Sequence, residues 1–225
     1  MAFNYSPKIV TNGLVLAVDA ANTKSYPGSG TVLRDLSGNG YTGTINNPSF
    51  SSNNTGTLVF NGTNSNVDFG NVLSNLTNLT LECFVKFGTQ TQLYSGVISK
   101  TLSNADGYEI RVDSYTASTT NLVFRYVGDN AAAGFNTNFT NGVWYHIAAT
   151  GTNGSQRTYV NGVQVGSATT ALSPSANSNS LMIARLTYAS YFVNMTMGCA
   201  RIYNRVLSAG EVLQNYNATK SRFGL

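Results

Sequence analysis

The sequence predicts an all-β fold in which two antiparallel sheets pack face to face as a sandwich, with one short helix near the C-terminus. Apolar and polar residues alternate with period two in many short segments, and clusters of Gly, Asn and Ser separate these segments. Helical periodicity starts only after Ser208. The chain has 225 residues, of which 42% are hydrophobic and 10% charged. This size and composition suit one undivided domain over residues 1–225.

The clearest strand covers residues 79–87. Its odd-numbered positions are apolar. The other face carries Thr80, Glu82, Phe84 and Lys86, and this alternation predicts a strand that is half buried. The same alternation recurs at 108–112, 122–126, 144–148 and 195–199.

Asn161-Gly162 is the strongest hairpin signal, because a two-residue type I′ turn needs positive φ at both central positions. At the other end of the chain, Ser208 and Glu211 have the spacing of a capping box. The sequence therefore predicts a hairpin around Asn161 and a short helix over residues 208–217. Residues 1–12 are left as an N-terminal arm and residues 218–225 as a C-terminal tail.

Cys83 and Cys199 both fall within apolar strand patterns. We expect two buried thiols that act as small hydrophobic side chains. A disulfide between them stays open if their strands are neighbours.

The net charge of +4 and the pI near 9.1 come from cations spread along the chain without a basic run, which argues against nucleic-acid binding. Residues 1–7 lack the basic start and apolar run of a signal peptide, and no stretch of about 20 apolar residues could span a membrane. We expect the chain to be made and folded in a cytosol.

Seven motifs carry a family resemblance in their order along the chain. They are GLVLAVDAANTKSYPGSG from Gly13, LRDLSGNGYTGT from Leu33, LVFNGTNSNVDFG from Leu58, LTLECFVKF from Leu79, GVWYHIAAT from Gly142, YVNG from Tyr159 and ARIYNRVLSAGEVLQNYNATKSRFGL from Ala200. Together they resemble the LamG-type concanavalin A-like lectin/glucanase jelly roll, in the version found in structural proteins of tailed bacteriophages.

This resemblance implies a non-catalytic virion protein, such as a capsid decoration, head-fibre or tail-associated protein. It would be assembled in the host cytoplasm and would contact other virion proteins, copies of itself and host-surface glycans. The low charge and the many tyrosines also favour self-association. The alternatives are a free-standing soluble lectin and, as a weaker one, a degenerate glucan hydrolase.

Hydrolysis of a glycosidic bond needs two carboxylates that flank it. In glucanases of the resembling superfamily, acidic residues alternate along one strand, and the nearest such row here is Glu109, Arg111 and Asp113. Arg111 occupies the middle position and should keep both carboxyl groups ionised, so we expect a surface ladder of paired charges and no catalytic residue.

Metal and histidine chemistry find little support in the sequence. His146 is the one histidine and lies in a strand pattern, which favours a packing role. Relatives of the resembling family often bind calcium on a rim loop, and Asp35, Ser37 and Asn39 form an oxygen-rich turn of that kind. With one carboxylate in this loop, hydrogen bonds that Asp35 accepts from nearby backbone amides account for the same residues. We therefore expect no required cofactor and no metal ligand, with calcium near Asp35, Ser37 and Asn39 as the alternative.

A sugar site needs aromatic faces beside planar hydrogen-bonding groups. Tyr188 and Tyr191 follow Arg185 in a segment between two strand patterns, where a rim loop should lie. On a regular strand two residues three apart face opposite sides, so both tyrosines reach one ligand only if the segment bends. The three residues are our candidate carbohydrate-binding residues.

Overall fold

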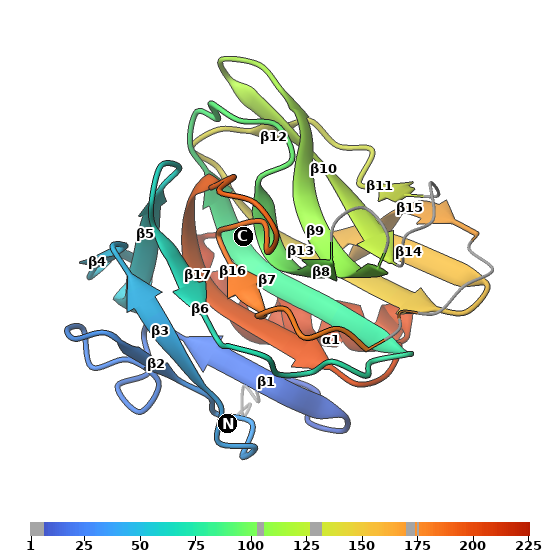
Figure 1. Cartoon of the computed structure of the whole chain (residues 1–225), viewed down its shortest axis with the longest axis horizontal. Coiled ribbons are helices and arrows are strands. Elements are labelled where there is room, and N and C mark those ends of the chain that lie inside the picture. Colours follow the sequence, from blue (N-terminus) through green and yellow to red (C-terminus); the bar gives the residue numbers. More distant parts are fainter. Residues whose placement is uncertain (1–6, 103–105, 127–131, 170–173, 175) are drawn as a thin grey trace, which may run out of the picture.

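The computed structural model describes residues 7–102, 106–126, 132–169, 174 and 176–225 (Figure 1). Within these residues it confirms the predicted sandwich of two antiparallel sheets, here called sheet A and sheet B. The strand order of sheet A is β15-β14-β13-β7-β17-β5-β4, and β1 also pairs with β17. That of sheet B is β11-β10-β9-β8-β16-β6-β3-β2, and β12 pairs with β10.

The bounds of the elements are as follows. Sheet A contains β1 (Leu14–Asp19), β4 (Ser49–Ser51), β5 (Thr57–Asn61), β7 (Leu79–Phe87), β13 (Trp144–Thr152), β14 (Ser155–Val160), β15 (Val163–Ala168) and β17 (Asn194–Tyr203). Sheet B contains β2 (Val32–Arg34), β3 (Thr42–Asn46), β6 (Asn66–Asp68), β8 (Gly96–Leu102), β9 (Asp106–Tyr115), β10 (Thr119–Tyr126), β11 (Ala132–Gly134), β12 (Phe139–Thr140) and β16 (Met182–Ile183). The helical elements are η1 (Asn53–Thr55), α1 (Ala209–Thr219) and η2 (Lys220–Phe223).

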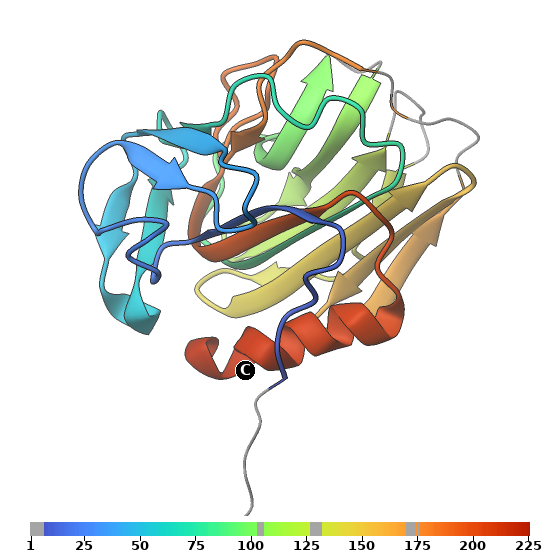
Figure 2. The ribbon, with the colours of Figure 1, turned by 90° about the horizontal axis from the view of Figure 1, so that it is seen from below.

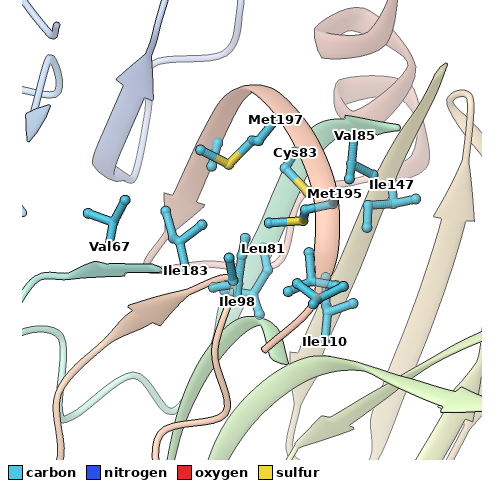
Figure 3. Close-up of a cluster of buried hydrophobic side chains, with 14 of the residues drawn as sticks. Val67, Leu81, Cys83, Val85, Ile98, Ile110, Ile147, Ile183, Met195 and Met197 are labelled. Atoms are coloured by element: carbon cyan, nitrogen blue, oxygen red, sulfur yellow. The ribbon is translucent and has the colours of Figure 1, made fainter. Parts of the chain in front are cut away.

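The main core fills the space between the two sheets. Figure 3 shows part of it, with side chains from β7, β13 and β17 of sheet A facing those from β6, β8, β9 and β16 of sheet B. Alternate residues of each of these strands point into the core and are apolar. The period-two pattern of the sequence is therefore confirmed for these strands.

The Asn161-Gly162 hairpin is confirmed. The two residues have φ of 50° and 80°, and they join β14 to β15, which pair antiparallel. Positive φ at both positions is what the two-residue turn requires.

A β-bulge in β17 changes the face to which one predicted core residue points. The register with β7 shifts between Met197 and Cys199, so Met195 and Met197 lie in the main core while Cys199 lies on the opposite face of sheet A. Gly198 is needed at this point because a Cβ there would collide with the ring of Phe223. The expected alternation through residues 195–199 is therefore wrong at its last position.

The bulge also settles the question of the two cysteines. Cys83 faces the core between the sheets, whereas Cys199 packs with Phe84, Trp144 and Phe223 on the outer face. Both thiols are buried and free. Although their strands are neighbours, the two side chains point to opposite sides of one sheet.

A second layer covers the outer face of sheet A. Figure 2 shows α1 lying along this face, beside the N-terminal segment that leads into β1. Phe223 stacks on Phe84 with ring centroids 4.7 Å apart and contacts Trp144 at 4.5 Å. Consequently β7 is buried on both faces apart from the half-exposed Lys86, and the expectation of a half-buried strand is wrong.

The predicted capping box is present. The Ser208 hydroxyl accepts a hydrogen bond from the Glu211 backbone amide, and the Glu211 carboxylate accepts one from the Ser208 amide. The helix runs over Ala209–Thr219 and continues into η2. The predicted end at residue 217 is too early, and the predicted tail at 218–225 is corrected to folded chain, because burial of Phe223 holds it against sheet A.

Of the predicted arm at residues 1–12, residues 1–6 lie outside the described residues. Residues 7–12 precede β1, and Val10 is buried against the helix layer. Its backbone amide donates to the side chain of Asn215 in α1 at 2.8 Å, which ties this segment to the helix.

A buried ion pair joins the second layer to sheet A. The Glu82 carboxylate on β7 accepts a hydrogen bond from the guanidinium of Arg201 on β17 at 2.6 Å and one from the side-chain amide of Asn215 at 2.9 Å. His146 on β13 lies 3.6 Å from the same carboxylate. Because Glu82 and His146 are fully buried, these charged and polar groups have no water to replace a lost partner.

The pH dependence of this pair has a defined sign. Burial by itself raises the pKa of Glu82, but the charge of Arg201 and the proximity of His146 outweigh it and lower the pKa from 4.5 to about 2. The stabilisation is therefore complete above pH 4.5 and is lost as the pH falls toward 2.

We predict that Glu82→Gln lowers the free energy of unfolding by about 3 kcal/mol at pH 7, because Arg201 stays buried without its counter-charge. Urea denaturation at pH 7 and at acid pH measures this, and the variant should lose stability less steeply than the wild type as the pH falls. Glu211→Gln is the matched control, since its carboxylate is partly exposed and its loss should cost about 1 kcal/mol. Equal stability of Glu82→Gln and the wild type at pH 7 would contradict the analysis.

Candidate carbohydrate-binding site

The outer face of sheet B carries a hollow of about 610 Å³. We call it the tyrosine hollow. The residues that line it come from β9, β10 and β11 and from the loops before β8 and between β16 and β17: Tyr94, Arg111, Asp113, Val123, Arg125, Ala132, Tyr188 and Tyr191. Pockets that hold small ligands have volumes of about 300–1,000 Å³, so the hollow is large enough for a sugar.

Two of the three predicted site residues meet in this hollow. Tyr188 and Tyr191 are 37% and 42% exposed and both line it. A turn brings them together: the Leu186 amide donates to the Tyr191 carbonyl at 2.9 Å, and the chain between them is neither strand nor helix. The bend that the three-residue spacing required is therefore present.

Arg185 has a different place from the one expected. Its Nε donates to the carbonyl of Ala189 at 3.2 Å, and its guanidinium lies over the ring of Phe192 at 5.5 Å. It does not occur among the described residues that line the hollow. These two contacts brace the loop that carries the tyrosines, and the assignment of Arg185 as a direct sugar ligand stays a prediction.

Beside the hollow lies a buried carboxylate. Glu109 is 1% exposed and accepts a hydrogen bond from Arg111 Nη1 at 3.0 Å. Arg125 Nη1 lies 3.7 Å from the same Glu109 oxygen, and the Ser99 hydroxyl lies 3.4 Å from the other. The predicted surface ladder of Glu109, Arg111 and Asp113 is therefore wrong at Glu109, because the loop that carries Tyr188 covers this position.

The burial of Glu109 also acts on its pKa, against the effect of Arg111. Burial raises the pKa of Glu109 above 4.5, and the charges of Arg111 and Arg125 offset this only in part. The sequence predicts that Arg111 keeps this carboxyl group ionised rather than raising its pKa, and the raised pKa of Glu109 runs against the second half of that prediction. The cost of removing the carboxylate from water is the larger effect.

Arg111 is held on two sides. Glu109 binds its Nη1, and its guanidinium stacks over the ring of Tyr94 at 4.7 Å. Its Nε is buried and has no hydrogen-bond partner among the described residues. A ligand in the hollow therefore meets an arginine whose position is already fixed.

A second, smaller hollow of about 300 Å³ adjoins the first and shares Asp113 and Val123 with it. Its remaining lining is mostly uncharged and hydrogen-bonding: Ser114, Asn121, Leu122, Gly134, Asn136, Thr137 and Asn138. The two hollows together form a longer polar surface across β9 and β10.

The hollow does not present the paired carboxylates of a glycosidase. Asp113 is the one carboxylate among the described residues that line it, and it is exposed. Glu109 lies beside Arg111 and Arg125 on the same face of sheet B, where its oxygens are already engaged. The arrangement can hold a polyhydroxyl ligand, but it offers no general acid beside a facing nucleophile or base.

We predict that the protein leaves laminarin, agarose, xylan and alginate intact, because no second accessible carboxylate lines the hollow beside Asp113 in the part of the chain that the structure describes. A reducing-end assay over long incubation checks this. Release of reducing ends by the wild type that disappears in Asp113→Asn would show a hydrolytic site and refute the prediction.

Two other candidates from the sequence have structural explanations. His146 is fully buried and packs against Phe84 at 4.8 Å between ring centroids. In the loop after β2, Asp35 accepts hydrogen bonds from the amides of Ala17 and Ser37, both at 2.8 Å, and from the Ser37 hydroxyl at 2.6 Å. These donors occupy both carboxylate oxygens.

Asn39 belongs to the same closed turn, since its side chain donates to the Val15 carbonyl at 3.1 Å. Within the part of the chain that the structure describes, no group of three His, Cys, Asp or Glu residues is placed to hold a metal ion. The same part has no helix with both the length and the apolar character needed to cross a bilayer.

Four residues that line the hollow were not singled out from the sequence: Tyr94, Val123, Arg125 and Ala132. Tyr94 lies in a polar loop with φ of 61°, and nothing in its sequence neighbourhood marks it as a partner of Arg111. Arg125 follows from the pairing of β9 with β10, which places it opposite Glu109. The opposite charges of Arg125 and Glu109 on two consecutive predicted strands are the signal in the sequence that could have indicated Arg125.

Comparison with known proteins agrees with the fold. Residues 61–213, more than half of the chain, match the sequence profile of the concanavalin A-like lectin/glucanases superfamily. No curated protein matches the chain.

Similar solved structures include two toxin domains and one domain of an enzyme. The binding domain of Paraclostridial Mosquitocidal Protein 1 has a TM-score of 0.71 and 16% identity over 92% of this chain and 52% of its own. The botulinum neurotoxin type G receptor binding domain has a TM-score of 0.67 and 17% identity over 91% of this chain and 51% of its own. The enzyme domain is domain 4 of AbnA, a GH43 extracellular arabinanase from Geobacillus stearothermophilus, solved in complex with arabinotriose. It has a TM-score of 0.67 and 18% identity over 90% of this chain and 98% of its own. The chain spans about half the length of the two toxin domains, and at these identities the likeness shows the fold.

Proposed function

Since the chain belongs to the concanavalin A-like lectin/glucanases superfamily, we propose that it is a non-catalytic glycan-binding domain and that the tyrosine hollow is its binding site. The observation that carries this proposal is the turn that brings Tyr188 and Tyr191 to one hollow beside the fixed Arg111. The similar structures named above are binding domains or a domain solved with a sugar, which supports the same class of function.

The chemistry of the hollow suits a sugar. Tyrosine rings offer flat apolar faces for the C–H side of a pyranose or furanose ring, and Arg111 offers donors for sugar oxygens. The exposed carboxylate of Asp113 accepts hydrogen bonds from sugar hydroxyls. A shallow site of this kind should bind in the millimolar range, about −4 kcal/mol, and becomes effective when many copies act together.

We predict that Tyr188→Ala/Tyr191→Ala loses at least about tenfold in binding of a multivalent display of the domain to a glycan array, since stacking on both rings is removed. The measurement compares the two displays at equal density. Val163→Ala, an exposed residue at the edge of sheet A, is the control and should bind like the wild type. Equal signals from the wild type and the double variant, or no signal from either, would contradict the proposed site.

The biological setting is a separate proposal. We infer that the domain is a structural component of a tailed-phage virion, on the capsid or the tail, where copies of the chain associate with one another and with other virion proteins. The ordered set of family motifs supports this, and a many-copy particle would supply the multivalency that a weak site needs. A free-standing lectin with the same hollow is the alternative.

The two settings differ in what the protein purifies with. A virion component should be found by mass spectrometry in purified particles, in many copies each. Recovery of the protein only in the particle-free fraction would favour the free-standing lectin.

A further inference from the structure

We infer that the second hollow, of about 300 Å³, is a further sugar subsite, and that the domain recognises a linear glycan through at least two consecutive units with free hydroxyl groups. We call this second hollow the amide hollow, after Asn121, Asn136 and Asn138, which line it. The inference rests on the proposed glycan-binding function. It names the class of glycan, a chain held along its length and not a single sugar unit.

A β-bulge lies where the two hollows meet. Asn121 of β10 pairs with Ser114 of β9, whereas the next residue, Leu122, pairs with Val112, so Asp113 is an extra residue on β9. On a regular strand Asp113 and Ser114 would face opposite sides. Here both are exposed; Asp113 lines both hollows and Ser114 lines the amide hollow. The bulge therefore places two consecutive hydrogen-bonding side chains on the path from one hollow to the other.

Side chains of the amide hollow are held in place by the protein itself. Asn121 Nδ2 donates to the Ser114 hydroxyl at 3.0 Å across the two strands. Asn136, in the loop between β11 and β12, donates from Nδ2 to the Val165 carbonyl of β15 at 2.9 Å, which fixes that wall. The first bond leaves the Asn121 amide oxygen and the Ser114 hydroxyl proton to meet a ligand. Because these side chains are already ordered, binding costs little further conformational entropy.

The lining of the amide hollow suits a sugar unit with free hydroxyl groups. Most of the described side chains that line it end in a hydroxyl or an amide group. Such groups both donate and accept hydrogen bonds, as sugar hydroxyl groups do. The tyrosine hollow, by contrast, offers ring faces for stacking. The two hollows thus supply complementary contacts to consecutive units of one chain.

The length of the combined site requires more than one unit. Arg111, under the ring of Tyr94, lines the tyrosine hollow, and Ser114 lines the amide hollow. A strand rises about 3.3 Å per residue, so these two positions of β9 are roughly 10 Å apart. A single pyranose or furanose ring is shorter than this span. A sugar stacked in the tyrosine hollow therefore reaches Ser114 only through a second unit.

The test measures affinity against chain length with soluble laminari-, xylo-, arabino- and N-acetyllactosamine oligosaccharides of one to five units, by NMR titration of the single domain. In the series that binds, the dissociation constant of the wild type should fall about tenfold between one unit and three, the gain expected from one or two added hydrogen bonds. Further units should change it little. Tyr188→Ala/Tyr191→Ala should weaken binding at every length.

The decisive variant is Ser114→Ala/Asn121→Ala, which should bind one unit like the wild type and lose the gain with length. Asn138→Ala reaches the same hollow from the loop between β11 and β12 and should lose part of the gain, so the test does not depend on the double variant being folded. Asn75→Ala, an exposed asparagine that lines neither hollow, is the matched control. Longer chains also offer more registers for binding, but wild type and variants share this statistical factor.

The outcomes separate the subsite from the proposed function. Binding that is equally strong for one unit and for longer chains, or a gain with length that both amide-hollow variants retain, would overturn the second subsite and leave glycan binding intact. Absence of binding to every series and to the glycan array would refute both.

Discussion

The buried pair of Glu82 and Arg201 is the contact on which the rest of the structure depends. It connects β7 to β17 at the centre of sheet A, and through Asn215 it reaches α1 and the segment before β1. A charge with so little water around it must keep its partners, so it fixes which helix face meets the sheet. With that face covered, β7 is buried on both sides and sheet A is a middle layer.

This layering leaves the outer face of sheet B for recognition. There the polar residues of β9 and β10 stay open to ligands, and the loop between β16 and β17 folds over one end of them to form the tyrosine hollow. The two glutamates at the sheet centres have opposite consequences. Glu82 has a lowered pKa and holds a rigid layer together, whereas Glu109 has a raised pKa and lies beside a surface that a ligand can reach.

Local patterns in the sequence predicted the parts of the fold that local physics decides. The Asn161 turn, the capping box at Ser208 and the alternation along 79–87 needed no knowledge of distant residues. The predictions failed where a partner comes from far along the chain. Burial of Glu82 depends on Arg201, the face of Cys199 depends on a bulge at Gly198, and the packing of Phe223 depends on Phe84.

The central claim is that the tyrosine hollow binds glycans. An NMR titration of the ¹⁵N-labelled protein with the best glycan from the array tests it most directly. The account predicts shifts of the backbone amides of Tyr94, Arg111, Asp113, Tyr188 and Tyr191 and of the side chain of Arg111. Shifts that cluster instead on the rim turn at Asp35 or on α1, with these amides unchanged, would contradict it.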